Sequence, residues 1–154
     1  MRPALHPTAV TAVTCAAAAL ALCVAAPAQA DPTFHTAKFP LMSVNGSTVT
    51  GSVIDIHTQG GRIYAQERYA LRGARPGTTY AVNLTAYGDN ACTTVVLAVP
   101  DSPTATANRA GNASARRTFP VPGPGAGVLY LRWTVTGPGT RLVAQTACVK
   151  VALD

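Results

Sequence analysis

Apolar and polar residues alternate with a period of two along most of the chain from residue 52 onward. This spacing places successive side chains on opposite faces of a β-strand, and no window shows the apolar spacing of an amphipathic helix. Turn-forming residues, mainly Gly, Pro and Asn, separate the alternating segments. The pattern predicts strands at 52–58, 62–71, 79–87, 94–99, 104–108, 113–119, 128–136 and 141–153. About eight short strands divided in this way indicate an all-β protein, an antiparallel two-sheet β-sandwich.

Two segments interrupt this pattern. Residues 31–46 contain Pro32 and Pro40 and predict an irregular N-terminal lead-in, so the β-sandwich domain is expected to occupy residues 47–154. Residues 120–127 are mostly Pro and Gly and predict an exposed loop. The 124 residues that follow position 30 are enough for one domain with a single core.

The first two expected strands are joined by two glycines at 60–61, which predict a two-residue hairpin turn. This turn sets Gln59 opposite Arg62 and places Glu67 among the apolar side chains of one face. The outward face then carries Val53, Asp55, His57, Tyr64, Gln66 and Arg68. Because an ionised carboxylate is costly to bury alone, Glu67 is expected to pair with an arginine or to lie at the margin of the sheet.

The apolar parity changes within the last expected strand. Leu142 and Ala144 share one face, whereas Val149 and Val151 share the other. An extra residue in one strand of an antiparallel pair produces such a change. A β-bulge or a switch between sheets is therefore expected near residues 145–147.

Residues 1–30 are typical of a secretory signal peptide. Arg2 precedes an apolar core at 16–26, and the sequence AQA at 28–30 supplies small residues at a cleavage site. No later segment reaches the roughly 18 apolar residues of a membrane-spanning helix. The protein is therefore expected to be secreted after cleavage near Ala30, without a membrane span.

Two cysteines, Cys92 and Cys148, lie outside the signal peptide. An even pair in an exported chain is most simply a disulfide bond. Neither cysteine has a second thiol or an imidazole at the spacing of a zinc site, so no metal and no other cofactor is expected.

The segment 71–82, LRGARPGTTYAV, resembles the strand-turn-strand corner of fibronectin type III and immunoglobulin-like domains. In that family a Gly, then Pro-Gly-Thr and a Tyr recur in this order. The resemblance implies an immunoglobulin-like sandwich in which Pro76 and Gly77 form the turn. It also implies that Tyr80 is the corner residue, whose hydroxyl group bonds to backbone upstream.

A second resemblance is to secreted apoproteins of the neocarzinostatin type, which are immunoglobulin-like carriers of a small apolar chromophore. Three segments carry it in order, at 73–82, 106–114 and 146–153. Those proteins have two short-range disulfides, whereas Cys92 and Cys148 would not be partners in their scheme. This resemblance implies a carrier of a small apolar ligand.

Candidate catalytic residues are few. Asp55 and His57 share one face of an expected strand and could orient a base, but Ser52 lies on the opposite face and no GxSxG elbow occurs. The interpretation without a catalytic role is a surface Asp55 near Arg68 and a surface His57 beside Tyr64. A hydrolase-type enzyme that uses Asp55, His57 or Glu67 is kept as an alternative to a protein without a catalytic role.

The chain has twelve basic and six acidic residues, which gives a net charge of +6. Five residues are expected to form an outward stripe with its extension into a turn: Arg62, Tyr64, Arg68, Arg72 and Arg75. Arginines beside an aromatic ring can bind phosphate or carboxylate polymers. No nucleic-acid-binding motif is present, so nucleic acid is not an expected partner. The expected function is non-catalytic binding of an anionic envelope polymer or a protein partner, with the small-ligand carrier as the alternative.

Overall fold

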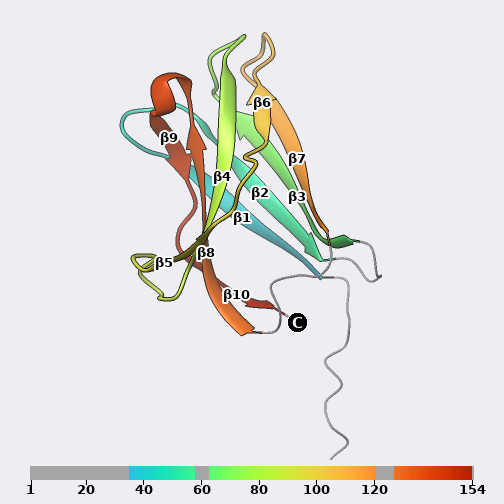
Figure 1. Cartoon of the computed structure of the whole chain (residues 1–154). Helices are drawn as coiled ribbons and strands as arrows, with labels where there is room; N and C mark the ends of the chain where they lie inside the picture. Colours follow the sequence, from blue (N-terminus) through green and yellow to red (C-terminus); the bar gives the residue numbers. More distant parts are fainter. Residues whose placement is uncertain (1–34, 58–62, 121–126, 154) are drawn as a thin grey trace, which may run out of the picture.

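The computed structural model describes residues 35–57, 63–120 and 127–153, which form β-strands and one short 3-10 turn (Figure 1). The elements are β1 (His35–Ser43), β2 (Thr50–His57), β3 (Ile63–Arg72), β4 (Thr79–Tyr87), β5 (Val95–Ala98), β6 (Thr104–Thr106), β7 (Ala113–Pro120), β8 (Gly127–Thr136), η1 (Pro138–Thr140), β9 (Leu142–Gln145) and β10 (Val149–Leu153). All of the strand pairs are antiparallel. The all-β, antiparallel character expected from the alternation is confirmed.

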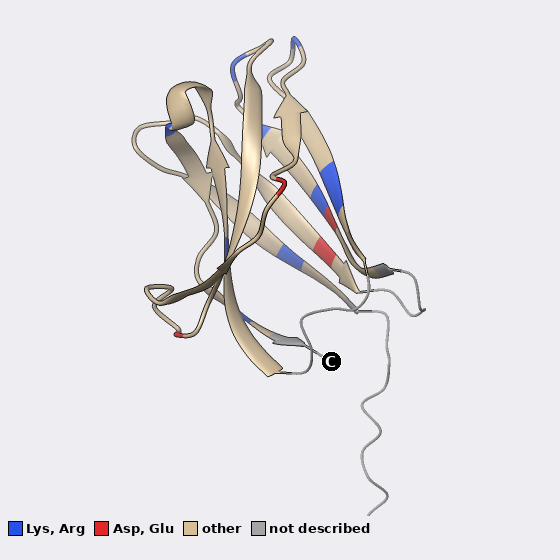
Figure 2. Ribbon diagram, viewed as in Figure 1, with Lys and Arg blue, Asp and Glu red and all other residues tan. Residues whose placement is uncertain are grey.

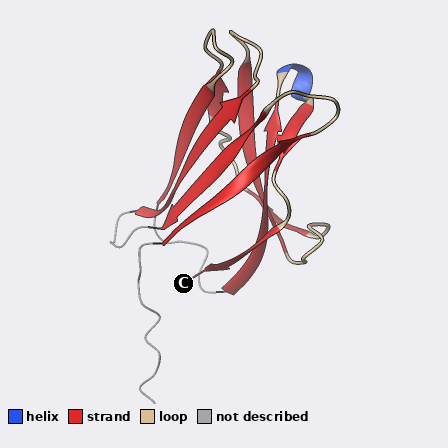
Figure 3. Ribbon diagram, turned by 180° about the vertical axis from the view of Figure 1, so that it is seen from behind, coloured by secondary structure: helices blue, strands red, loops and turns tan. Residues whose placement is uncertain are grey.

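The ten strands of the described residues form one sheet that curls on itself. Its order is β5-β4-β8-β9-β1-β2-β3-β7, with β10 paired to β8 and β6 paired to β4. Figures 1 and 3 show two halves that face each other across a concave inner face. We call them the β3 half (β1, β2, β3 and β7) and the β8 half (β4, β5, β6, β8, β9 and β10). A short pairing joins them, in which Met42 and Ser43 of β1 lie opposite Gln145 and Ala144 of β9.

The hydrophobic core lies on the inner face, between the halves. Trp133 of β8 is fully buried, and its ring stacks on Phe39 of β1 with the ring centroids 5.0 Å apart. Alternate residues of most of the strands supply much of the rest, including Val53, Tyr69, Leu71, Tyr80, Val82, Leu84, Leu131 and Val135. Burial of this apolar surface is the main force that holds the curled sheet together.

Strand β1 corrects the prediction of an irregular lead-in over residues 31–46. Residues 35–43 are a strand that pairs with β2 and, at its end, with β9. Pro40 concealed it, because proline cannot donate a ladder hydrogen bond and argues against a central strand. The strand tolerates Pro40 since β9 begins to pair only at Met42, which leaves one edge of β1 open at residue 40.

The register of the β2–β3 hairpin also differs from the prediction. Val53 lies opposite Tyr69 and Asp55 lies opposite Glu67, one residue away from the expected pairing. A slip of one residue moves every side chain of a strand to its other face. Val53 and Asp55 are therefore buried on the inner face, whereas Ile54 takes an outward position. The predicted glycine turn itself lies outside the described residues.

The expected irregularity near residues 145–147 is confirmed as a break between β9 and β10. Both strands pair with β8, but their registers differ by one residue across the break. The buried Thr146 bridges it, because its backbone N–H donates to the Trp133 carbonyl at 3.0 Å. Its hydroxyl oxygen accepts the Trp133 backbone N–H at 3.2 Å.

The turn before β4 has the hydrogen bond that the corner resemblance implied. The backbone N–H of Arg75 donates to the hydroxyl oxygen of Tyr80 at 3.0 Å. Gly77 has φ near 71°, a conformation that favours glycine. Its N–H donates to the Ala107 carbonyl at 2.8 Å and ties this turn to the segment after β6.

The disulfide between Cys92 and Cys148 is present, as expected. It joins the loop between β4 and β5 to the break between β9 and β10. The two residues are separated by 56 positions, so the bond closes a long loop.

Candidate functional site

A cavity of about 360 Å³ opens at one end of the inner face, where β2 and β7 end and where β3 and β8 begin. The β8 half and the segments beside it supply an aliphatic wall of Leu84, Ala86, Leu97, Leu129, Leu131 and Val151. The β3 half contributes Ala65 and Phe119. Concave, mostly apolar pockets with a few convergent polar groups are typical of small-molecule binding sites.

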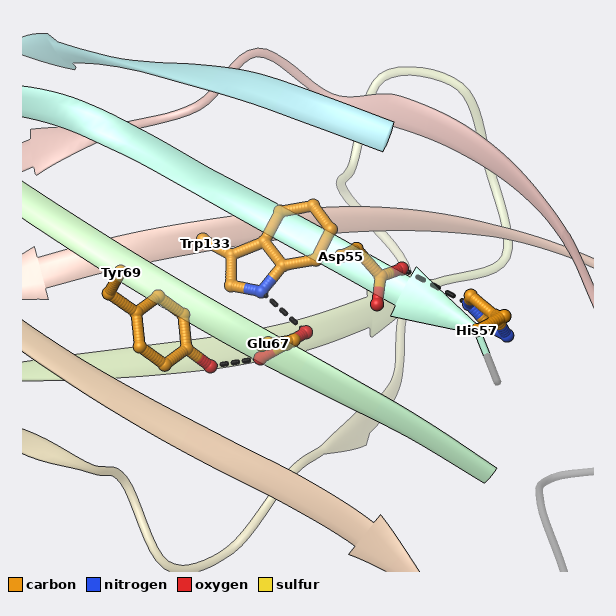
Figure 4. Close-up of polar contacts among 5 residues, drawn as sticks. All are labelled: Asp55, His57, Glu67, Tyr69 and Trp133. Carbon is orange, nitrogen blue, oxygen red and sulfur yellow. Dashed lines mark hydrogen bonds and ion pairs between the residues drawn. The ribbon is translucent and has the colours of Figure 1, made fainter. Parts of the chain in front are cut away.

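The polar groups of this cavity gather on β2 and β3. Asp55, His57 and Glu67 line it, with Asp55 only 5% exposed and Glu67 only 2% exposed. Asp55 and Glu67 lie directly opposite each other in the β2–β3 ladder. Figure 4 shows the Asp55 carboxylate pointing to His57, with Oδ2 and Nε2 3.2 Å apart. The His57 ring meets Tyr64 edge-on at 5.2 Å.

Glu67 links the two halves through buried hydrogen bonds. The indole N–H of Trp133 donates to Glu67 Oε1 at 2.8 Å, and the hydroxyl group of Tyr69 donates to Oε2 (Figure 4). Burial raises the pKa of Glu67 to about 7, although the hydrogen bonds from Tyr69 and Trp133 oppose the rise, and the charge of Asp55 adds to it. Glu67 is therefore partly protonated near neutral pH.

The prediction for Glu67 was wrong in both of its forms. Glu67 lies in the core and not at a sheet margin, and within the described ranges it forms no ion pair with an arginine. Arg117 lies opposite it on β7, but its guanidinium donates to the Pro100 carbonyl and stands over the Phe119 ring. Two neutral donors, the Trp133 indole and the Tyr69 hydroxyl, take the place of the expected cation.

The prediction for Asp55 was also wrong, because it shares the inner face with Glu67 and does not lie near Arg68 on the surface. His57 does lie beside Tyr64, as expected, but it lines the cavity and is not on the outer surface. The one-residue slip of the hairpin register explains the error for Asp55. Placing Val53 on the buried face would have placed Asp55 there as well, because residues two positions apart on a strand share a face. Asp55 and His57 are thus brought to one cavity with Glu67.

A nucleophile for these groups is not found among the described residues of the cavity lining, which include no Ser, Thr or Cys. Ser52 belongs to the outward positions of β2 and pairs with Ala70. Within residues 35–57, 63–120 and 127–153, no cluster of three or more His, Cys, Asp or Glu could hold a metal ion. The absence of a catalytic role stays a prediction.

The expected arginine stripe is only partly assembled. Arg68 and Arg72 are exposed at outward positions of β3, as predicted. Tyr64 does not belong with them, because the register shifts between Ile63 and Ala65 and Tyr64 lines the cavity. Arg75 is exposed in the turn before β4. Arg62 lies outside the described residues.

Comparison of the chain with protein-family models, curated proteins and solved structures found no match. The resemblances to fibronectin type III, immunoglobulin-like and neocarzinostatin-type proteins therefore remain predictions. In the described part of the chain, no helix has the length and apolar character needed to cross a membrane.

Proposed function

We propose that the protein binds a small, largely apolar ligand in the cavity of the inner face and does not transform it chemically. The observation that supports this function best is the cavity itself, about 360 Å³ and walled mainly by aliphatic side chains. Its volume falls within the range of about 300–1,000 Å³ that is usual for small-ligand sites. The apolar walls would provide affinity by removing the ligand from water.

The polar side of the cavity would orient the ligand. Glu67 has a pKa of about 7 and already accepts two hydrogen bonds. Such a carboxyl group can contact a neutral hydroxyl, carbonyl or amide group without the cost of a full buried charge. We therefore propose a ligand with an apolar body and one uncharged polar end directed at Asp55 and Glu67.

The proposed function agrees with an immunoglobulin-like sandwich of the carrier type. In this interpretation the β3 half and the β8 half are the two sheets, and the Tyr80 hydroxyl fixes the corner between them. Carriers of small apolar ligands need a cleft between sheets, and the cavity has that position. Binding of an anionic polymer would use a different surface, the outward side of the β3 half.

Binding can be tested with N-phenyl-1-naphthylamine, an uncharged apolar probe whose emission rises in apolar sites. We expect saturable binding of one probe per chain. The emission of Trp133, the only tryptophan of the chain, should change with it, because its indole bonds to Glu67 at the cavity. Absence of saturable binding would remove the proposal.

Two substitutions on β5 provide a matched comparison. Leu97 lines the cavity and is 49% exposed, whereas its neighbour Val96 does not line it and is 59% exposed. Leu97→Asp places a charge at the apolar wall and should weaken probe binding by at least about tenfold, since a desolvated charge is costly. Val96→Asp adds the same charge to the same strand and should leave binding unchanged. Equal losses would show that the probe binds elsewhere.

We also propose that the protein is exported and cleaved after Ala30. The Cys92–Cys148 disulfide supports an oxidising compartment, where such bonds persist. The intact mass of the protein from the culture medium should match a chain that begins at Asp31 and has two fewer hydrogens than the reduced form. A mass that still includes residues 1–30 would contradict cleavage.

A further inference from the structure

The outward face of the β3 half brings cationic side chains from three strands into one row. The strand pairings set Lys38 of β1 opposite Ile54 of β2, Ile54 opposite Arg68 of β3, and Arg68 opposite Arg116 of β7. Directly opposed residues of antiparallel strands project on the same face with their Cβ atoms about 5 Å apart. Lys38, Arg68 and Arg116 are all exposed. Arg72 is exposed on the same face of β3, two rows away, with Ala70 in the row between.

No acidic residue balances this row among the described residues of the face. Asp55 and Glu67 belong to the same strands but are buried on the inner side. Asp89 and Asp101 lie in the loops that flank β5. Figure 2 shows the blue Lys and Arg positions on β1, β3 and β7. Like charges at opposed positions, as for Arg68 and Arg116, are destabilising in an unoccupied sheet, and a bound anion would relieve that repulsion.

A shallow groove runs beside the cationic row. It is lined by Lys38 and Arg72, by the hydroxyl residues Thr50 and Ser52, and by the small Ala70. Its volume is about 510 Å³. Guanidinium groups donate paired hydrogen bonds to phosphate oxygens, and hydroxyl groups can donate to the remaining oxygens. The groove therefore offers the donors that a phosphate group needs.

The same face has no aromatic side chain at its described outward positions, which are Thr36, Lys38, Pro40, Met42, Thr50, Ser52, Ile54, Ile56, Gln66, Arg68, Ala70, Arg72, Ser114, Arg116 and Thr118. Proteins that hold single-stranded nucleic acid combine cations with aromatic rings on which bases stack. A face with cations and hydroxyl groups but without an aromatic ring at these positions favours a polymer that is recognised by its charges. The row from Lys38 to Arg116 spans three strand spacings, roughly 14 Å.

We propose that this face binds a linear polymer with repeated phosphate groups, which lies across the strands over Lys38, Arg68 and Arg116 with one phosphate in the groove beside Arg72. A single phosphate ion contacts only part of the row, so a chain of several phosphates binds more tightly. The site is separate from the cavity, which lies on the opposite side of the same strands.

The test uses end-labelled inorganic polyphosphate and the full protein, with binding followed by fluorescence anisotropy at several salt concentrations. Binding should weaken steeply as salt rises, because contacts to a polyanion release its counterions. Orthophosphate at the same total phosphate concentration should compete poorly. Binding that is insensitive to salt, or equal competition by orthophosphate, would overturn the proposal.

Two double variants with the same change in net charge distinguish binding at the proposed site from non-specific electrostatic attraction to the whole protein. Arg68→Gln with Arg116→Gln should weaken binding by at least about tenfold, because two charge-assisted contacts are lost. Arg109→Gln with Lys150→Gln removes two exposed cations from outside the β3 half and should change affinity by less than about twofold. Equal losses in the two variants would overturn the site.

Two further measurements distinguish this proposal from ligand binding in the cavity and from nucleic-acid recognition. The Arg68/Arg116 variant and the native protein should bind N-phenyl-1-naphthylamine equally, since the two sites lie on opposite sides of the β3 half. A single-stranded oligonucleotide of equal charge should bind no more tightly than polyphosphate. Tighter binding of the oligonucleotide would replace the proposal with nucleic-acid recognition. An unchanged midpoint of thermal unfolding would show that the exposed substitutions leave the fold intact.

Discussion

Raising the pH from about 4.5 to 7 should lower the free energy of unfolding by about 3 kcal/mol through Glu67 alone. The pKa of this group is about 7 in the folded protein, whereas its ordinary value is 4.5. Between these two values the folded state holds the proton more tightly than the unfolded state does. Stability is therefore fully present below the lower value, falls as the pH rises through the window, and levels off above the folded pKa.

Glu67→Gln is the variant that isolates this effect. The amide keeps the shape of the side chain but cannot ionise, so the decline in stability between pH 4.5 and 7 should be smaller by the same amount. The measurement is urea unfolding of both proteins at a series of pH values, compared by slope. Asp89 does not interfere, because backbone hydrogen bonds from Thr94 and Thr93 lower its pKa to about 2. Parallel pH profiles of the two proteins would contradict the role of Glu67.

The raised pKa also bears on ligand binding. An uncharged ligand that desolvates Glu67 further should favour its protonated form, so it should bind more tightly below pH 7 than above it. This dependence has the same origin as the loss of stability, which is the cost of a buried charge without a cation at hydrogen-bonding distance. The two effects should disappear together in Glu67→Gln.

Removal of the Cys92–Cys148 disulfide should lower the free energy of unfolding by about 4 kcal/mol. The bond spans 56 positions, and a cross-link over so long a loop limits the conformations of the unfolded chain. It also anchors the loop before β5. The strand β5 itself is poorly buried, since its residues Val95 and Val96 are exposed. We expect the loss in Cys92→Ala with Cys148→Ala, measured by urea unfolding.

Reduction of the native protein provides the control for the disulfide. A reducing agent breaks only the covalent link, so its effect should match that of the double variant and should be absent when added to the variant. Agreement within about 1 kcal/mol would assign the effect to the cross-link, given the usual error of extrapolated unfolding energies. A loss below about 1 kcal/mol in both cases would show that packing alone holds the two loops together.

The strands could be predicted because alternation is a local property. In β4, Tyr80, Val82 and Leu84 are buried on one face as the sequence indicates, since each strand must bury one row against a core. The same holds for Leu131, Trp133 and Val135 in β8.

The candidate site was only partly predictable, because it depends on register. Asp55, His57 and Glu67 were all candidate catalytic residues in the sequence. The two-residue glycine turn assumed at 60–61, however, placed Asp55 on the outward face. The Tyr64 register shift and the pairing of Phe39 with Trp133 involve residues that are far apart in the chain. No local pattern encodes such contacts.

The sequence by itself determined the all-β character, the positions of nearly all the strands and the disulfide pair, because these follow from side-chain periodicity, turn chemistry and the count of cysteines. Only the tertiary structure decided that residues 35–43 form a strand, since β1 is stabilised by neighbours on both halves. It also decided that Glu67 is satisfied by Trp133 and Tyr69, because a buried carboxylate takes whichever donors the packed halves bring within reach.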